Sequence, residues 1–82
     1  MTTMRAKLQV SSVQVHEETK QETVNFHAVS KSGAYPEDGS DDDNTYAKWS
    51  PSAHLSILIA NPALHGKFSA GEKFYVDFTP AE

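Results

Sequence analysis

Apolar and polar residues alternate through the first part of this chain, and the alternation changes phase once. The apolar residues before the change share one parity and those after it share the other: Ala6, Leu8 and Val10, then Val13 and Val15. A period of two predicts a β-strand, because successive side chains of a strand point to opposite faces. A strand that inserts one extra residue, a β-bulge, keeps both halves of such a pattern on the core side. We therefore predict a bulge at Ser11 and Ser12.

The next alternating run, residues 21–30, predicts a second strand that forms a hairpin with the first. Its apolar side chains are Val24, Phe26 and Ala28. With Thr19 and Lys20 at the tip of the turn, apolar residues face apolar residues along the whole hairpin, as cross-strand pairing favours. The predicted pairs are Val15 with Val24, Val13 with Phe26, and Val10 with Ala28.

A third extended segment, residues 45–60, is interrupted by Pro51. Apolar residues alternate before the proline and again after it: Ala47 and Trp49, then Leu55, Ile57 and Ile59. Because proline has no N–H for a strand ladder, we expect the strand to bend there or to lie at a sheet edge. We expect Trp49 to be half-buried, and Leu58, which breaks the alternation, to face a second layer or a partner.

The last part of the chain predicts a short helical turn and a final strand. Asn61 and Pro62 form a helix-start signal and Gly66 a stop signal, so one turn is expected near 62–65. The final strand carries its apolar side chains on one face: Phe74, Val76 and Phe78. Together these segments predict a single all-β domain over residues 1–82, a small antiparallel barrel or sandwich of four to five strands.

Acidic residues concentrate in one predicted loop, residues 31–44, which is rich in Gly, Ser and Asp. Five of the eleven acids lie within seven residues that contain no base, and the other six acids face seven bases in the rest of the chain. Long loops usually have a use, and we expect this one to be exposed. The predicted partner contacts are the acids of the loop, two nearby tyrosines and one leucine: Glu37, Asp38, Asp41, Asp42, Asp43, Tyr35, Tyr46 and Leu58.

Four interpretations of the acidic loop stay open: a solvated loop, a docking site for a basic partner, a calcium site and a nucleotide site. Glu37, Asp41 and Asp43 could share a calcium ion, although the spacing of an EF-hand is missing. A nucleotide could stack on three aromatic side chains that flank the loop, with a strip of four lysines on the far side. The aromatic residues are Tyr35, Tyr46 and Trp49, and the lysines are Lys7, Lys31, Lys48 and Lys67. Outside the acidic loop the chain is close to neutral and has no basic face, which disfavours a nucleic-acid partner.

Sequence patterns of catalysis and metal binding are missing. The chain has no cysteine, no Gly-x-Ser-x-Gly elbow and no phosphate-binding glycine loop. The spacing of its four histidines does not match zinc-ligand pairs: His16, His27, His54 and His65. A chain of 82 residues also rarely encloses a substrate pocket. We therefore expect no enzyme activity, no cofactor and no metal.

The short chain predicts low stability, and the lack of long apolar runs predicts where the protein is located. A domain of 82 residues buries a small share of its surface, so we expect a thin margin of stability and help from a partner or a homo-oligomer. No apolar run has the length of a signal peptide or of a membrane span. We therefore expect a cytoplasmic protein without a membrane partner.

Four segments at the two ends of the chain resemble a known group of proteins. The segments are Arg5-Ala6-Lys7, Val10-Ser11-Ser12-Val13, Asn61-Pro62-Ala63-Leu64 and Phe74-Tyr75-Val76-Asp77-Phe78-Thr79-Pro80-Ala81. This set is similar to small, mostly uncharacterised proteins of tailed bacteriophages that end in an aromatic strand followed by Phe-Thr-Pro-Ala. The resemblance implies a phage origin, with the protein in the host cytoplasm during infection or in the virion. It implies no catalytic residue.

Two functions follow from a phage origin. The first is a virion structural or accessory protein of the capsid-decorating or cement type, which docks on other phage structural proteins through strand edges and apolar side chains. The second is an intracellular inhibitor of a host defence system, which binds a host protein or a nucleotide. We favour the first, because a mimic of nucleic acid usually spreads its acids over a whole face and here they are confined to one loop.

Overall fold

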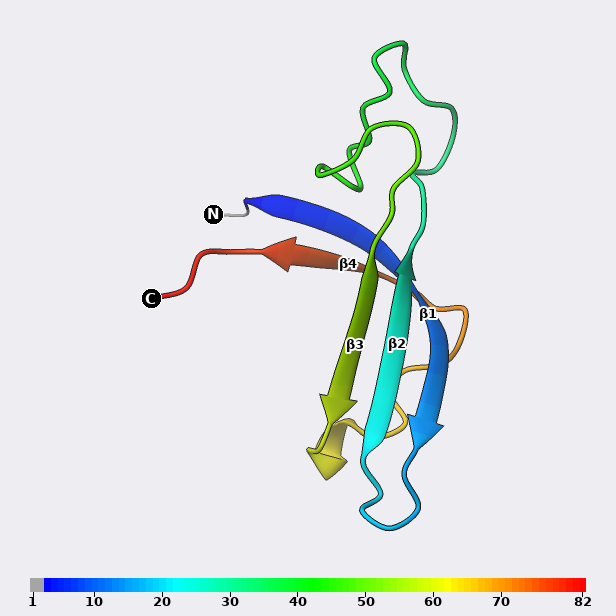
Figure 1. Ribbon diagram of the computed structural model, residues 1–82, viewed down its shortest axis with the longest axis vertical. Coiled ribbons are helices and arrows are strands. Elements are labelled where there is room, and N and C mark those ends of the chain that lie inside the picture. The colour runs from blue at the N-terminus through cyan, green and yellow to red at the C-terminus, as the bar shows by residue number, and fades with distance from the viewer. Residues whose placement is uncertain (1–2) are drawn as a thin grey trace.

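The computed structural model describes residues 3–82, which form one antiparallel β-sheet (Figure 1). Its elements in chain order are β1 (Met4–Val15), β2 (Glu22–Ala28), β3 (His54–Ile59), the 3-10 turn η1 (Pro62–Leu64) and β4 (Lys73–Phe78). The strands lie in the order β3-β2-β1-β4. The expected all-β class, four antiparallel strands and the short helical turn are confirmed. The sheet is single and is not closed into a barrel.

The first strand organises the sheet because it bends at a bulge. Its pairing with β2 shifts by one residue between Val10 and Ser12, which confirms the predicted bulge. The first half of β1, from Met4 to Gln9, also pairs with β4. In Figure 1, β4 and the start of β1 therefore run across the direction of β2 and β3. The bend curves the sheet and gives it an inner face.

The hairpin register differs from the predicted one by two residues. Val13 lies opposite Val24, Val10 opposite Phe26, and Leu8 opposite Ala28. The turn is centred one residue earlier than expected, with His16 N donating to the Gln21 carbonyl at 2.8 Å and Lys20 in a left-handed conformation at φ 64°. A shift of two residues leaves every side chain on the same face. The apolar pattern therefore could not distinguish the two registers.

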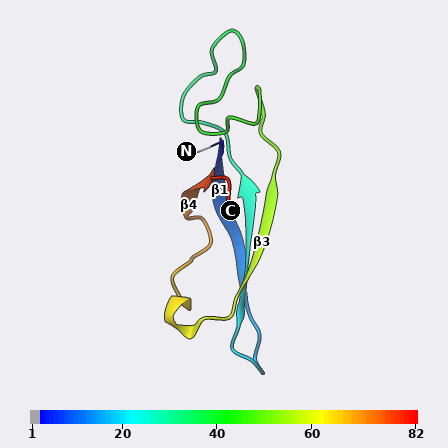
Figure 2. The same ribbon diagram turned by 90° about the vertical axis from the view of Figure 1, so that its left-hand side faces the viewer.

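The core lies on the inner face of the sheet. Its buried side chains come from three strands: Ala6, Leu8, Val10, Val24, Phe26 and Ile59. The connection between β3 and β4 crosses one end of this face (Figure 2). It brings Phe68 edge-on to Phe26, with ring centroids 5.9 Å apart, and the backbone N–H of Gly66 to the buried carboxylate of Glu22 at 3.1 Å. One half of the inner face is thereby covered by the chain itself.

The third strand is shorter than predicted but lies at a sheet edge, as Pro51 suggested. It begins only at His54, after the proline. Trp49 is not part of it: its φ is 66°, its side chain is 53% exposed, and its ring lies over Gly39 in the preceding loop. Trp49 is thus about half-buried, as expected, but it packs on the loop and not in the core.

The prediction that residues 31–44 form an exposed loop is wrong in part. Asp41 and Asn44 are only 3% and 0% exposed. The Asn44 amide accepts from Lys7 N at 2.7 Å and donates to the Val29 carbonyl at 2.8 Å. Thr45 N donates to the Arg5 carbonyl at 3.0 Å. Since β2 ends beside Leu8, this loop supplies the hydrogen bonds that β2 would otherwise have made to the start of β1.

Across residues 3–82, no helix has the length and apolar character needed to cross a bilayer.

Candidate binding surface

The uncovered half of the inner face forms a hollow of about 430 Å³, which we call the apolar trough. It is lined by residues of β1, β3, β4 and the connection between β2 and β3: Met4, Ala6, Leu8, Tyr46, Ser52, Ala53, His54, Leu55, Ile57, Val76 and Phe78. Figure 2 shows β3 and β4 on opposite sides of β1 and β2, so the trough lies between the two edge strands. Its lining is apolar apart from one phenol, one hydroxyl and one imidazole.

Large apolar side chains stand exposed along both sides of the apolar trough. Ile57 on β3 is 43% exposed and Phe78 on β4 is 49% exposed. Each belongs to an alternating pattern whose other members are more deeply buried, such as Ile59 at 8%. A sheet that does not close leaves the inner residues of its edge strands in contact with water. Exposed apolar surface of this kind marks interaction sites in soluble proteins.

Tyr46 brings one polar group into the apolar trough. Its side chain packs against the core, and its hydroxyl is buried without a hydrogen-bond partner among residues 3–82. Burial, with a smaller contribution from the Asp41 carboxylate, raises the pKa of Tyr46. The phenol therefore stays neutral and can donate to an acceptor. Tyr46 had been predicted as a partner contact on the loop surface, and the structure places it inside the fold.

The free edge of β3 carries no charge. Between Lys48 and Lys67 the sequence has no Asp, Glu, Lys or Arg. Ala28 N donates to the Ala53 carbonyl, and hydrogen-bonded pairs alternate in antiparallel strands, so the backbone groups of alternate β3 residues face away from β2. These residues are His54, Ser56 and Leu58. The Leu58 side chain, a predicted partner contact, is 56% exposed.

The free edge of β4 is charged and already engaged by neighbouring side chains. Arg5 forms two hydrogen bonds to the Asp77 carboxylate, at 2.7 and 3.1 Å, and its guanidinium lies 4.8 Å from the centre of the Tyr75 ring. The hydrogen bond from Arg5 lowers the pKa of Asp77 and, reciprocally, raises the pKa of Arg5. Lys73 adds a charge at the start of the strand. Charged residues on an edge strand hinder pairing with another strand.

The acidic cluster is divided between internal and exposed carboxylates. Asp41 accepts hydrogen bonds from Lys31 N, the Tyr35 hydroxyl, and groups of Asp43 and Asn44. Burial raises the pKa of Asp41, but these donors outweigh burial and hold the pKa below its ordinary value. Asp41 thus organises the loop from a buried position.

Three other acids of the cluster remain at the surface and a fourth is bonded to β1 and β4. Asp43 lies 3.4 Å from Lys7 Nζ and accepts from the Tyr75 hydroxyl at 3.1 Å. Glu37, Asp38 and Asp42 are exposed. The Ser40 backbone N–H, at 3.0 Å, lowers the pKa of Asp38. The predicted contacts therefore do not form one acidic surface.

Two aromatic side chains of the loop lie together. The rings of Tyr35 and Trp49 are 5.9 Å apart at a tilt of 57°. Burial and the hydrogen bond to the Asp41 carboxylate raise the pKa of Tyr35. Gly39, at φ 73°, lies directly under the Trp49 ring, where a side chain would collide with the indole. The pair stabilises the loop, while the Trp49 ring keeps half of its surface exposed.

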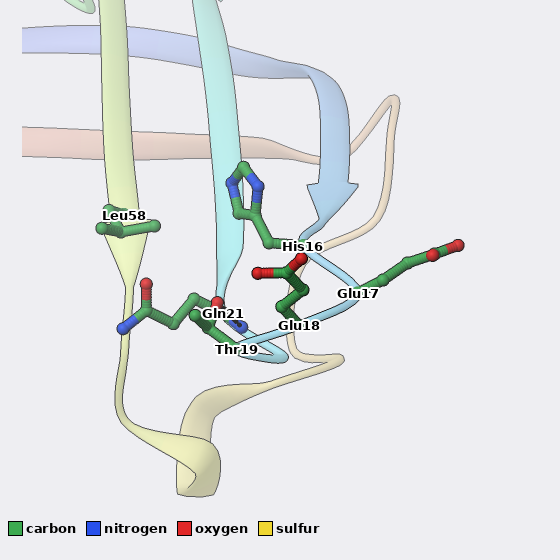
Figure 3. Close-up of a pocket in the computed structure, with 6 residues that line it drawn as sticks. All are labelled: His16, Glu17, Glu18, Thr19, Gln21 and Leu58. Carbon is green, nitrogen blue, oxygen red and sulfur yellow. Dashed lines mark hydrogen bonds between the residues drawn. The ribbon is translucent and has the colours of Figure 1, made fainter.

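A second hollow, of about 540 Å³, lies beside the turn between β1 and β2 (Figure 3). Its lining residues are His16, Glu17, Glu18, Thr19, Gln21 and Leu58. In Figure 3 the Glu17 side chain points away from the others, and only Leu58 is apolar. His16 Nε2 lies 2.7 Å from Thr23 Oγ1 within the sheet. The His16 imidazole therefore already has a partner within the protein.

The histidines are spread over the sheet and its connections. His27 contacts Ser11 Oγ at the bulge and lies opposite His54 on the next strand, whereas the His65 ring lies 3.1 Å from the Ile59 carbonyl. In the part of the chain that the structure describes, no three His, Asp or Glu side chains are grouped to hold a metal ion.

Comparisons of this chain with protein-family models, with curated proteins and with solved structures found no match. The geometry of the open sheet therefore carries the functional argument.

Proposed function

We propose that this chain is a non-catalytic assembly protein that docks on other proteins through the open side of its sheet. The observation that carries the proposal is the apolar trough, which has exposed Ile57 and Phe78 on its two sides. No segment of residues 3–82 covers it. Burying such surface against another chain is favourable, at roughly 25 cal/mol for each Å² of apolar area.

Protein is the partner class that fits an open sheet best. Beside the apolar trough, β3 presents unpaired backbone groups, and an added strand from a partner can satisfy them while its side chains enter the trough. A small molecule would leave the edge unpaired. No carboxylate lines the trough, and its few polar groups include no activated nucleophile, which favours binding over catalysis.

Because the two chain ends resemble small tailed-phage proteins, we propose that the assembly is a phage particle. A capsid-decorating or cement-type protein needs a docking surface and several identical copies. The apolar trough and the neutral edge of β3 meet the first need. Such a protein would be made in the host cytoplasm and carried in the particle.

The alternative, an inhibitor of a host defence system that presents its acids as a nucleic acid does, has less support. Two of the five clustered acids are used internally: Asp41 is buried and Asp43 is bonded to Lys7 and Tyr75. Three acids remain exposed, Glu37, Asp38 and Asp42, which is a small acidic surface for a protein or nucleotide. We therefore keep this function as the second candidate.

Mass spectrometry of purified phage particles tests the proposal. We expect the wild-type chain in a fixed number of copies per particle. Phe78→Asp places a charge beside the apolar trough at the end of β4, so it should remove the chain from particles while circular dichroism shows an unchanged fold. Asp42→Asn alters an exposed acid and serves as the matched control, which should remain in particles. Absence of the wild-type chain from particles, or loss through Asp42→Asn alone, would refute the proposal.

A further inference from the structure

The geometry points to a second copy of this chain as the occupant of the β3 edge. We infer that two copies pair through β3 in antiparallel orientation about a two-fold axis, which joins two four-stranded sheets into one. The inference rests on the proposed function in that both use the open side of the sheet. It adds the identity of the first partner and the strand that binds it.

The backbone of β3 is ready for such pairing. His54, Ser56 and Leu58 direct their N–H and C=O groups away from β2, as the bond from Ala28 N to the Ala53 carbonyl indicates. Two antiparallel copies of one strand are related by a two-fold axis, so each copy offers the other the same row of donors and acceptors. No other strand of residues 3–82 occupies this edge.

Under this two-fold symmetry, apolar side chains of β3 in one copy meet apolar side chains of β3 in the other. Paired residues point to the same face of a sheet, so inner residues must meet inner residues. With Ile57 on the axis, Ile57 meets its own copy and Leu55 meets Ile59. With Ser56 on the axis, Ser56 meets its copy and Leu55 meets Ile57. Either register puts apolar groups against apolar groups on the inner face and continues the apolar trough from one copy to the other.

The lack of charge favours a second copy over an unrelated partner. Near a two-fold axis each side chain lies close to its own copy, so a charged residue there meets a like charge and destabilises the pair. The stretch between Lys48 and Lys67 has no charged residue, in a chain of which 22% is charged. The edge of β4 differs, because it carries Lys73 and Asp77 and is held by Arg5. Of the two outermost strands of the sheet, β3 is therefore the one with a neutral edge.

Disulfide cross-linking gives a sharp test, because the wild-type chain has no cysteine. Ser56→Cys and Ile57→Cys each place a single thiol on the axis of one of the two registers described above, where paired Cα atoms lie about 4.5–5.5 Å apart. The matched controls are Tyr75→Cys on β4 and Gln14→Cys on exposed β1 surface. At roughly 10 µM protein, one of the two β3 variants should cross-link about a hundredfold faster than both controls, since pairing raises the effective thiol concentration to the order of millimolar.

A charged substitution near the axis provides a second test of pairing through β3. Ser56→Lys brings two like charges together in the dimer, so we expect it to sediment as a monomer where the wild-type chain sediments as a dimer. Gln14→Lys adds the same charge away from the edge and should leave the dimer intact. A wild-type monomer at roughly 100 µM, or faster cross-linking through Tyr75→Cys than through either β3 variant, would overturn the inference. If the wild-type chain is monomeric yet present in particles, only the dimer fails; if it is dimeric yet absent from particles, only the proposed function fails.

Discussion

At the scale of single residues, Asn44 is the most informative side chain. It is fully buried, and its amide bonds the backbone of Lys7 and Val29 where no strand lies beside β1. The alternation of apolar and polar residues predicted which apolar side chains form the core, because every second side chain of a strand points to the same face. It could not locate Asn44, because burial of a polar residue depends on partners that lie far along the chain.

We expect Asn44→Ala to destabilise the protein by roughly 2–4 kcal/mol. The change leaves a backbone donor and a backbone acceptor without partners, at about 1–3 kcal/mol each. Urea denaturation followed by circular dichroism measures the loss. Asn25→Ala is the matched control, since Asn25 makes only an exposed bond to Ser12 Oγ, at 3.2 Å. An equal effect of the two substitutions would contradict the role given to Asn44.

Asp41 makes the stability of the fold depend on pH. Its hydrogen-bond donors hold its pKa in the folded state below the ordinary value of 3.8. A lowered pKa contributes stability above the ordinary pKa, and this contribution is lost as pH falls through the lower, folded value. We expect the urea midpoint of the wild-type chain to fall below about pH 4. Asp41→Asn should be less stable at neutral pH and show a smaller fall, whereas the exposed control Asp42→Asn should follow the wild-type curve.

At the scale of elements, the bulge allows β1 to pair with both β2 and β4. The phase change of the apolar residues predicted it from sequence, because only an extra residue keeps Val10 and Val13 on one face. The hairpin register was not predictable in the same way, since a shift of two residues preserves the face of every side chain. The turn decides that register through the left-handed conformation of Lys20.

Deletion of Ser11 should therefore disrupt the fold far more than its substitution. The deletion forces either the residues before the bulge or those after it onto the outer face. Exposing about three apolar side chains, at roughly 1.5–3 kcal/mol each, is comparable with the whole stability of a small domain. Thermal melts should show no cooperative transition for the deletion. Ser11→Ala loses only the exposed contact with His27 and should melt within a few degrees of the wild-type chain.

At the scale of the whole molecule, the open sheet is the feature with functional consequences. The sequence predicted the strands and their inner faces but not the apolar trough, because Ile57, Val76 and Phe78 have the same pattern in a closed core and at an open edge. Whether a sheet closes depends on strand number and on which strands become edges, and neither follows from alternation. The charge-free stretch around β3 was the one feature of the sequence that pointed to this surface. It can be interpreted only once β3 is known to lie at an edge of the sheet.

Residue-resolved amide hydrogen exchange of the wild-type chain tests most directly whether the β3 edge binds a second copy. Leu55 and Ile57 direct their N–H groups to β2, whereas Ser56 and Leu58 direct theirs outward. If a second strand occupies the edge, all four amides exchange slowly at high protein concentration, and those of Ser56 and Leu58 become faster on dilution. If Ser56 and Leu58 exchange at the rate of exposed loop amides at every concentration while Leu55 and Ile57 remain protected, the edge is free and the account is contradicted.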